Sequence, residues 1–108
     1  MDISPDQLAL VRCILARHVP ECEVSAFGSR VAGTAKKHSD LDLAVMTSEP
    51  LSLRRLARLK EDFSESRLPF KVDVVDWSEA SESFRSIIRA RCEVIQAARP
   101  DPKPKPRC

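Results

Sequence analysis

Glycine, the residue that permits the sharpest backbone turns, occurs only twice in this chain of 108 residues. Both glycines, Gly28 and Gly33, lie within six residues of each other. Such a composition excludes loop-rich and repetitive folds, which use glycine throughout. Gly28 in particular lets the backbone turn sharply and approach a ligand closely.

Composition places the chain among single-domain globular proteins. It is long enough for one modest core but not for two, with 43% apolar and 31% charged residues. No apolar run approaches the ~20 residues that span a bilayer. The apolar stretch 8–19 is interrupted by Arg12 and Arg17 and is not a signal peptide. The four cysteines have no zinc-like spacing and are expected to be incidental thiols, so we expect a cytoplasmic protein.

Positive charge is concentrated at the C-terminus. Residues 99–108 alternate proline with charge and hold four basic residues and one acidic residue. We expect this stretch to be a disordered, solvated tail, and residues 1–98 to form the folded domain. Those 98 residues carry 14 basic and 15 acidic groups. The net charge of +2 is therefore weak support for nucleic-acid binding, and we expect none.

Turn signals and hydrophobic spacing divide the domain into alternating helices and strands. Ser4, Pro5 and Gln7 form the capping box of a first helix. The strands are expected from alternating apolar residues, and the other helices from apolar residues three or four positions apart. The expected elements are a helix before Pro20, strand 23–27, a short helical connection 30–34, strand 40–45, a helix between Ser52 and Pro69, strand 71–76 and a final helix over 84–95. This order predicts an α/β fold, a small sheet with helices packed against it.

Each of the two later helices carries an apolar stripe. After Ser52 the residues expected to be buried are Leu53, Leu56, Leu59 and Phe63. In the final helix they are Phe84, Ile87, Ile88, Val94 and Ile95. Ile87, Ile88 and Ile95 could instead serve an interface, but ordinary core packing is the simpler interpretation.

Acidic side chains alternate with apolar ones on the second and third strands. Because residues two apart on a strand face the same side, Asp40 and Asp42 share the face opposite the apolar residues. If the third strand lies beside the second, Asp73 joins them across about 4.8 Å. Clustered carboxylates repel one another unless a cation lies between them, and Mg²⁺ or Mn²⁺ prefers such ligands. The pattern predicts a metal site, although an outward strand face can also be merely polar.

The turn at Gly28 is complementary to this acidic cluster. Gly28-Ser29 begins a helical turn whose free N–H groups suit a phosphate, and Ser29 is expected to donate its hydroxyl. Arg30 either assists or is a solvated helix residue. Although Gly28 and Gly33 have the spacing of a P-loop, Thr34 stands where that motif requires lysine, and this reading fails.

These segments together resemble the signature of the DNA polymerase β-type nucleotidyltransferases. The matching residues are 27–30 (Phe-Gly-Ser-Arg) and 39–45 (Ser-Asp-Leu-Asp-Leu-Ala-Val), with Asp73 where that family places its third carboxylate. More narrowly, the chain is similar to the minimal nucleotidyltransferases, or MNT proteins. The resemblance runs from about Leu8 to Ile95, and motif, spacing and length agree.

The resemblance implies a mixed β-sheet flanked by helices, the nucleotidyltransferase fold. It implies Mg²⁺ or Mn²⁺ held by Asp40, Asp42 and Asp73, which are also the catalytic residues, with Asp73 helping to deprotonate the acceptor hydroxyl. It also implies that a nucleoside triphosphate such as ATP is the substrate. The implied nucleotide-binding residues are Gly28, Ser29, Arg30 and Ser39.

Two further polar residues lie close to these motifs. Asp76 is an odd number of positions from Asp73 and should face the other side of the strand, where we expect a structural role. His38 could contact phosphate, but a surface histidine is the commoner case.

A partner is implied by the family as well. MNT proteins typically form a complex with a HEPN-domain protein, and in several pairs the MNT antitoxin transfers AMP to a tyrosine of that toxic ribonuclease. The chain has no Tyr, so a tyrosyl acceptor must lie on another molecule. No second domain is expected here to grip a nucleic acid or an antibiotic, so we expect a partner to present the acceptor.

Two alternatives to this function are considered. The chain could be a catalytically silent subunit that neutralises a HEPN-type partner by complex formation, but the full set of three aspartates argues against decay of the site. Transfer to a small molecule such as an aminoglycoside is less favoured, because such enzymes usually need an additional substrate domain.

Overall fold

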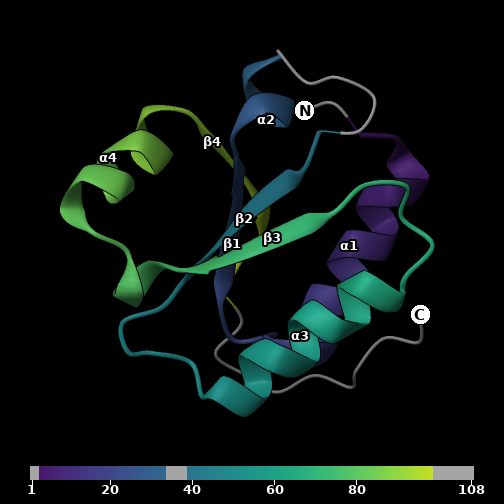
Figure 1. Cartoon of the computed structure of the whole chain (residues 1–108), viewed down its shortest axis with the longest axis horizontal. Helices are drawn as coiled ribbons and strands as arrows, with labels where there is room; N and C mark the ends of the chain where they lie inside the picture. The colour runs from purple at the N-terminus through teal and green to yellow at the C-terminus, as the bar shows by residue number, and fades with distance from the viewer. Residues whose placement is uncertain (1–2, 34–38, 99–108) are drawn as a thin grey trace.

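The computed structural model describes residues 3–33 and 39–98, which form a four-stranded sheet with helices on both faces (Figure 1). The elements in chain order are α1 (Pro5–His18), β1 (Glu23–Phe27), α2 (Ser29–Ala32), β2 (Leu41–Met46), α3 (Leu53–Glu65), β3 (Val72–Asp76), the 3₁₀ turn η1 (Trp77–Glu79), α4 (Glu82–Ala90) and β4 (Cys92–Gln96). The expected α/β architecture is confirmed, whereas His38 and the expected tail lie outside the described residues. None of the helices in the described ranges is long and apolar enough to cross a membrane.

Serine side chains cap the first turns of α1, α3 and α4. The Ser4 hydroxyl accepts a hydrogen bond from the Gln7 N–H at 3.2 Å, and the Gln7 side chain accepts one from the Ser4 N–H at 2.9 Å. This is the predicted capping box, and it satisfies two backbone donors that the first turn of α1 leaves unpaired. Ser52 and Ser81 cap α3 and α4 with their hydroxyls in the same way.

The strands lie in the order β3-β2-β1-β4. β1 is antiparallel to both of its neighbours, β2 and β4, whereas β2 and β3 are parallel. A parallel pair needs a long crossover connection, and α3 provides it here. The sheet is therefore mixed, and the second and third strands are neighbours, as the site prediction required.

Side-chain alternation gives this sheet two different faces. α1 and α3 cover one face, and α4 lies on the other (Figure 1). On the first face the fully buried β2 residues are Leu41, Leu43 and Val45. On the second face a smaller cluster consists of Phe27, Ala44 and Ile88. Asp42 of β2 and Asp73 of β3 lie on this second, less covered face, whereas Asp76 of β3 lies on the first.

The prediction of one long final helix over 84–95 is wrong. α4 ends at Ala90, Arg91 has extended dihedral angles (φ −157°, ψ 105°), and the chain continues as β4 beside β1. Of the apolar residues expected to be buried, Ile88 of α4 is buried, whereas Ile87 is 65% and Val94 53% exposed. Ile95 is buried from β4 and belongs to the other core. The spacing of seven residues between the apolar pairs 87–88 and 94–95 mimics a helix, and pairing with β1 overrides it.

The prediction that Leu53 is buried is also wrong. It was expected in the buried stripe of α3, yet its side chain is 85% exposed, whereas Leu59 and Phe63 of the same helix are buried. Leu53 is the first residue of α3, and the helix packs against the core only from Leu56 onward. Helical spacing indicates which face of α3 is buried but not how far along the helix the core extends.

A matched pair of substitutions on α3 tests this packing. Leu59→Ala removes a fully buried side chain and is expected to lower the free energy of unfolding by about 2–5 kcal/mol. Leu53→Ala removes a mostly exposed one and should change it by less than about 0.5 kcal/mol. Urea unfolding followed by circular dichroism measures both, and equal losses from the two variants would contradict the position of α3.

Candidate active site

Two carboxylates are brought side by side by the parallel pairing of β2 and β3. Asp42 is the register partner of Asp73, and Leu41 that of Val72. The Leu41 N–H donates to the Lys71 carbonyl at 2.9 Å, which joins the two strands where they begin. Since adjacent strands lie about 4.8 Å apart, both carboxylates face the same side at nearly the same height.

Asp40, the third member of the predicted set, comes two residues before Asp42 and directly precedes β2. Its side chain is partly exposed, as are those of Asp42 and Asp73. All three acidic residues therefore lie at the same end of the β2–β3 pair, where β2 begins and where solvent can reach them.

The turn at Gly28 closes over this end of the sheet. β1 ends at Phe27, the register partner of Asp42, and Gly28 follows with φ +84° and ψ −162°, a conformation that only glycine adopts readily. A Cβ on Gly28 would lie 2.1 Å from Oδ2 of Asp42. The absence of a side chain at Gly28 is therefore what leaves room for the Asp42 carboxylate.

α2 continues from this turn for four residues. The Gly28 carbonyl accepts hydrogen bonds from the N–H groups of Val31 and Ala32, and Gly33 ends the helix in the left-handed conformation at φ +79°. Ser29 is the first residue of α2 and is partly exposed beside Gly28. A phosphate contact of Ser29 stays a prediction.

Like charges and burial act together on Asp42. Burial raises the pKa of the Asp42 carboxyl above its ordinary value of 3.8, and the negative charges of Asp73 and Asp40 raise it further. Lys71 directly precedes β3, and its Nζ lies 3.5 Å from Oδ1 of Asp73.

This donor set has the chemistry of a site for a hard divalent cation. All three groups are carboxylates, and a cation among them would relieve their mutual repulsion. Within residues 3–33 and 39–98, however, no three His, Cys, Asp or Glu side chains are gathered closely enough to hold a metal ion as they stand. The metal role of Asp40, Asp42 and Asp73 therefore stays a prediction.

Arg30 is not the solvated helix residue that was one of its two expected roles. Its side chain is only 6% exposed. Its Nε donates to the Ser39 carbonyl at 2.9 Å, and its guanidinium carbon lies 4.1 Å from the centre of the Phe70 ring. Phe70 was not among the predicted site residues, because nothing in the sequence around Pro69 indicates which cation an aromatic ring there will contact.

Asp76 has the structural role that its position on β3 predicted. Its carboxylate, which is buried, accepts hydrogen bonds from the Thr47 hydroxyl, from the Leu51 N–H at 2.8 Å and from the Ser78 N–H at 3.0 Å. Burial alone would raise the pKa of Asp76, but these hydrogen bonds outweigh it and lower the pKa below its usual value. Asp76 thereby ties the end of β3 to the segment that leads into α3.

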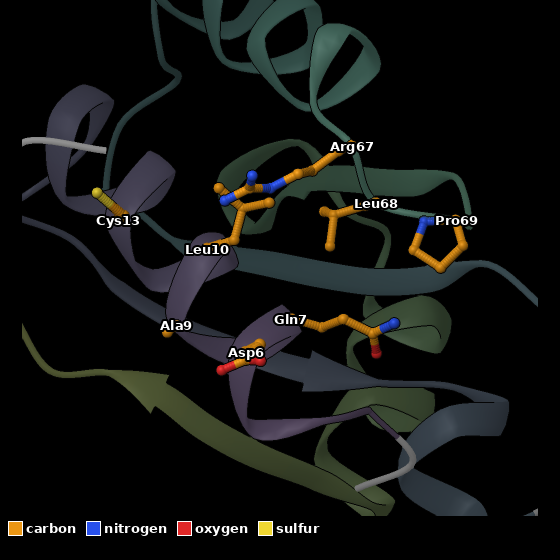
Figure 2. Close-up of a pocket in the computed structure, with 8 residues that line it drawn as sticks. All are labelled: Asp6, Gln7, Ala9, Leu10, Cys13, Arg67, Leu68 and Pro69. Carbon is orange, nitrogen blue, oxygen red and sulfur yellow. The ribbon is translucent and has the colours of Figure 1, made fainter.

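Cavities lie both at the candidate site and away from it. One of about 560 Å³ includes Asp73 and Lys71 together with Phe70. Another, of about 700 Å³, lies between α1 and segment 67–69, where Gln7 and Leu10 face Arg67 and its neighbours (Figure 2). No predicted site residue lines the larger cavity, so the candidate site is the carboxylate end of the sheet rather than the more spacious hollow.

The fold and this site together define a nucleotidyltransferase. Residues 14–99 match the family model "Polymerase beta, Nucleotidyltransferase", and the chain belongs to that family. It is 55% identical over 96 residues to a probable protein adenylyltransferase MntA of Haemophilus influenzae (strain Rd). That alignment covers 89% of this chain and 84% of the relative. The resemblance seen in the sequence motifs is thus confirmed.

Solved structures agree on the fold. A crystal structure of a toxin–antitoxin with AMP-PNP matches with a TM-score of 0.72 at 24% identity, over 84% of this chain and 73% of that chain. A crystal structure of the toxin–antitoxin MntA–HepT matches with a TM-score of 0.67 at 20% identity, over 88% and 74% respectively. At such identities the likeness establishes the fold, which is the one expected from the resemblance.

The two glycines provide a matched test of the turn. Gly28→Ala places a Cβ against the Asp42 carboxylate, whereas Gly33→Ala meets no atom within 4 Å although its φ is similar. We expect Gly33→Ala to cost about 1 kcal/mol of backbone strain and to preserve nucleotidyl transfer. Gly28→Ala should cost about 1–3 kcal/mol and reduce transfer by about 100-fold, because the carboxylate is displaced.

Urea unfolding and a nucleotidyl-transfer assay on the same preparations separate strain from displacement. Equal activity in the two glycine variants would show that the contact between Gly28 and Asp42 does not matter for the reaction.

The raised pKa of Asp42 predicts a pH dependence of stability. Between the ordinary value of 3.8 and the higher value in the folded protein, the folded state binds more protons than the unfolded state. The contribution of Asp42 therefore becomes more unfavourable as pH rises through this range. We expect Asp42→Asn to be more stable than wild type at neutral pH, with a difference that shrinks below about pH 4.

Urea unfolding of both proteins at several pH values measures this difference. An Asp42→Asn variant that is less stable than wild type at neutral pH would contradict the electrostatic account.

Proposed function

We propose that this protein is a metal-dependent nucleotidyltransferase that transfers AMP, or another nucleoside monophosphate, from a nucleoside triphosphate to a hydroxyl of a partner protein. We further propose that it is the cytoplasmic antitoxin of a HEPN/MNT toxin–antitoxin pair. The name of the relative at 55% identity, a probable protein adenylyltransferase, supports the reaction. The toxin–antitoxin structures that share the fold support the partner class.

One observation carries the proposal for this chain. The parallel register of β2 and β3 sets Asp42 opposite Asp73, and the Gly28 backbone packs directly against the Asp42 carboxylate. A turn suited to phosphate and a set of acidic ligands thus meet at one end of the sheet. Nucleotidyl transfer needs this juxtaposition, because the triphosphate and its counter-cation must be held together.

Asp40, Asp42 and Asp73 are the residues that would hold Mg²⁺ or Mn²⁺. When bound, such an ion neutralises phosphate charge and favours ionisation of the attacking hydroxyl. The N–H groups at the Gly28 turn, the Ser29 hydroxyl and Ser39 are the groups we assign to the nucleotide. They orient the triphosphate so that its α-phosphorus faces the carboxylates.

Asp73 is the residue we assign to the proton. Its side chain is 43% exposed, so an acceptor hydroxyl can reach it from the second, less covered face of the sheet. Asp73 takes the hydroxyl proton, and the acceptor oxygen forms a bond to the α-phosphorus. The bond between that phosphorus and the oxygen of the leaving group breaks, and pyrophosphate departs with its electron pair.

The acceptor we propose is a tyrosine hydroxyl of the HEPN-domain partner. The 108 residues contain no tyrosine, so modification of a tyrosine among them is excluded. A serine or threonine hydroxyl of the partner would leave the same mass, and peptide mapping of the product distinguishes these acceptors.

Intact-mass spectrometry tests the function. Incubation with the HEPN-domain partner, ATP and Mg²⁺ should add adenylyl groups to the partner, and Asp42→Asn should reduce the rate by at least about 100-fold. Asp6→Asn, which alters an exposed aspartate in the first turn of α1, is the matched control and should react as wild type does.

No added mass with any nucleoside triphosphate would refute the proposal. If an Asp40→Ala/Asp42→Ala double variant still neutralised the partner fully, the protein would act as a binding subunit instead.

A further inference from the structure

The burial of Arg30 next to the candidate site needs an explanation. A guanidinium withdrawn from water is unfavourable unless its charge and N–H groups find partners in the protein. Arg30 is 6% exposed, and two of its partners are the Ser39 carbonyl, 2.9 Å from its Nε, and the face of the Phe70 ring.

The two partners belong to the two segments that deliver the carboxylates. Ser39 directly precedes Asp40 and the start of β2, and Phe70 lies three residues before Asp73 in the approach to β3. Arg30 itself follows Ser29 on α2, directly after the Gly28 turn. One side chain therefore contacts both strand approaches from the helical turn that starts at the candidate phosphate site.

Arginine is specifically suited to this arrangement. Its planar guanidinium can lie flat on an aromatic ring while an N–H in the same plane donates to a carbonyl, whereas lysine offers a single charged point and no plane. The 4.1 Å distance between the guanidinium carbon and the ring centre is that of such a stacked contact. The same contact directs the guanidinium toward protein groups instead of solvent.

We propose that Arg30 is a positioning residue, which holds the segment of Ser39 and Asp40 and the approach to Asp73 in register with the Gly28 turn. This role replaces the direct phosphate contact that the sequence suggested for Arg30. A misplacement of about 1 Å at a reacting centre can cost about 100-fold in rate. A side chain that fixes the positions of the catalytic segments therefore affects catalysis without touching the substrate.

The inference rests on the proposed function for its catalytic readout, and a second readout is independent of activity. Arg30→Met keeps a long side chain that packs well on an aromatic ring but removes the charge and the Nε donor. Arg30→Lys keeps the positive charge but removes the planar guanidinium group. Arg12→Met is the matched control, because Arg12 also donates its Nε to a backbone carbonyl, that of Ile95 at 3.0 Å, on the edge strand β4 far from β3.

Kinetics of adenylyl transfer to the HEPN-domain partner give the first readout. We expect kcat to fall by about 10- to 100-fold in both Arg30 variants, with KM for ATP changed by less than about 3-fold, and no such fall in Arg12→Met. If Arg30→Lys keeps the kcat of the wild type while Arg30→Met raises KM for ATP, Arg30 binds phosphate through its charge and the proposal is overturned.

Amide hydrogen exchange gives the second readout, without nucleotide or partner. The Leu41 N–H, which donates to the Lys71 carbonyl, should exchange faster in Arg30→Met than in wild type, while amides in the centre of β1 change little. Unchanged protection of Leu41 would overturn the positioning role. If wild type transfers nothing to any acceptor, the proposed function fails, and the exchange of Leu41 still decides whether Arg30 holds the strand approaches together.

Discussion

The pairing of β2 with β3 is the interaction on which the rest of the site depends. Because the two strands are parallel and in register, Asp42 lies opposite Asp73, and the same register places Leu43 beside Val74 on the other face. A slip of one residue would turn the carboxylates into the core and the apolar residues into solvent. The hydrophobic core therefore specifies the geometry of the site, since burial of one face of β2 decides what the other face presents.

This arrangement also explains how the protein tolerates an unfavourable cluster of charges. Like charges directly opposite on neighbouring strands are destabilising. The pKa of Asp42 is raised first by burial and then by the charges of Asp73 and Asp40. The same strand carries Leu41, Leu43 and Val45, all fully buried beneath α1 and α3. Their hydrophobic contribution, about 1.5–3 kcal/mol for each large apolar side chain, holds the strand in place against this repulsion.

Local rules predicted most of the fold and the shared face of Asp42 and Asp73, whereas the roles of the site residues stay predictions. The capping box at Ser4, the alternation along β2 and the odd spacing between Asp73 and Asp76 depend on near neighbours, and each is found as predicted. The errors concern contacts between distant segments. Val94 and Ile95 are recruited into the sheet by β1, and no local pattern reveals that pairing. The burial of Arg30 likewise depends on Phe70, which lies 40 positions further along the chain.

β4, although only five residues long, pairs the backbone groups along the outer edge of β1. It is the outermost strand beside β1, and Arg91 alone separates it from α4. A chain that ended before Cys92 would leave the backbone N–H and C=O groups of β1 unpaired along one whole edge, and an open edge of this kind recruits strands from other molecules. Pairing with β4 thus satisfies the outer edge of β1, the strand whose end leads into the Gly28 turn, and makes β4 the edge strand of the sheet.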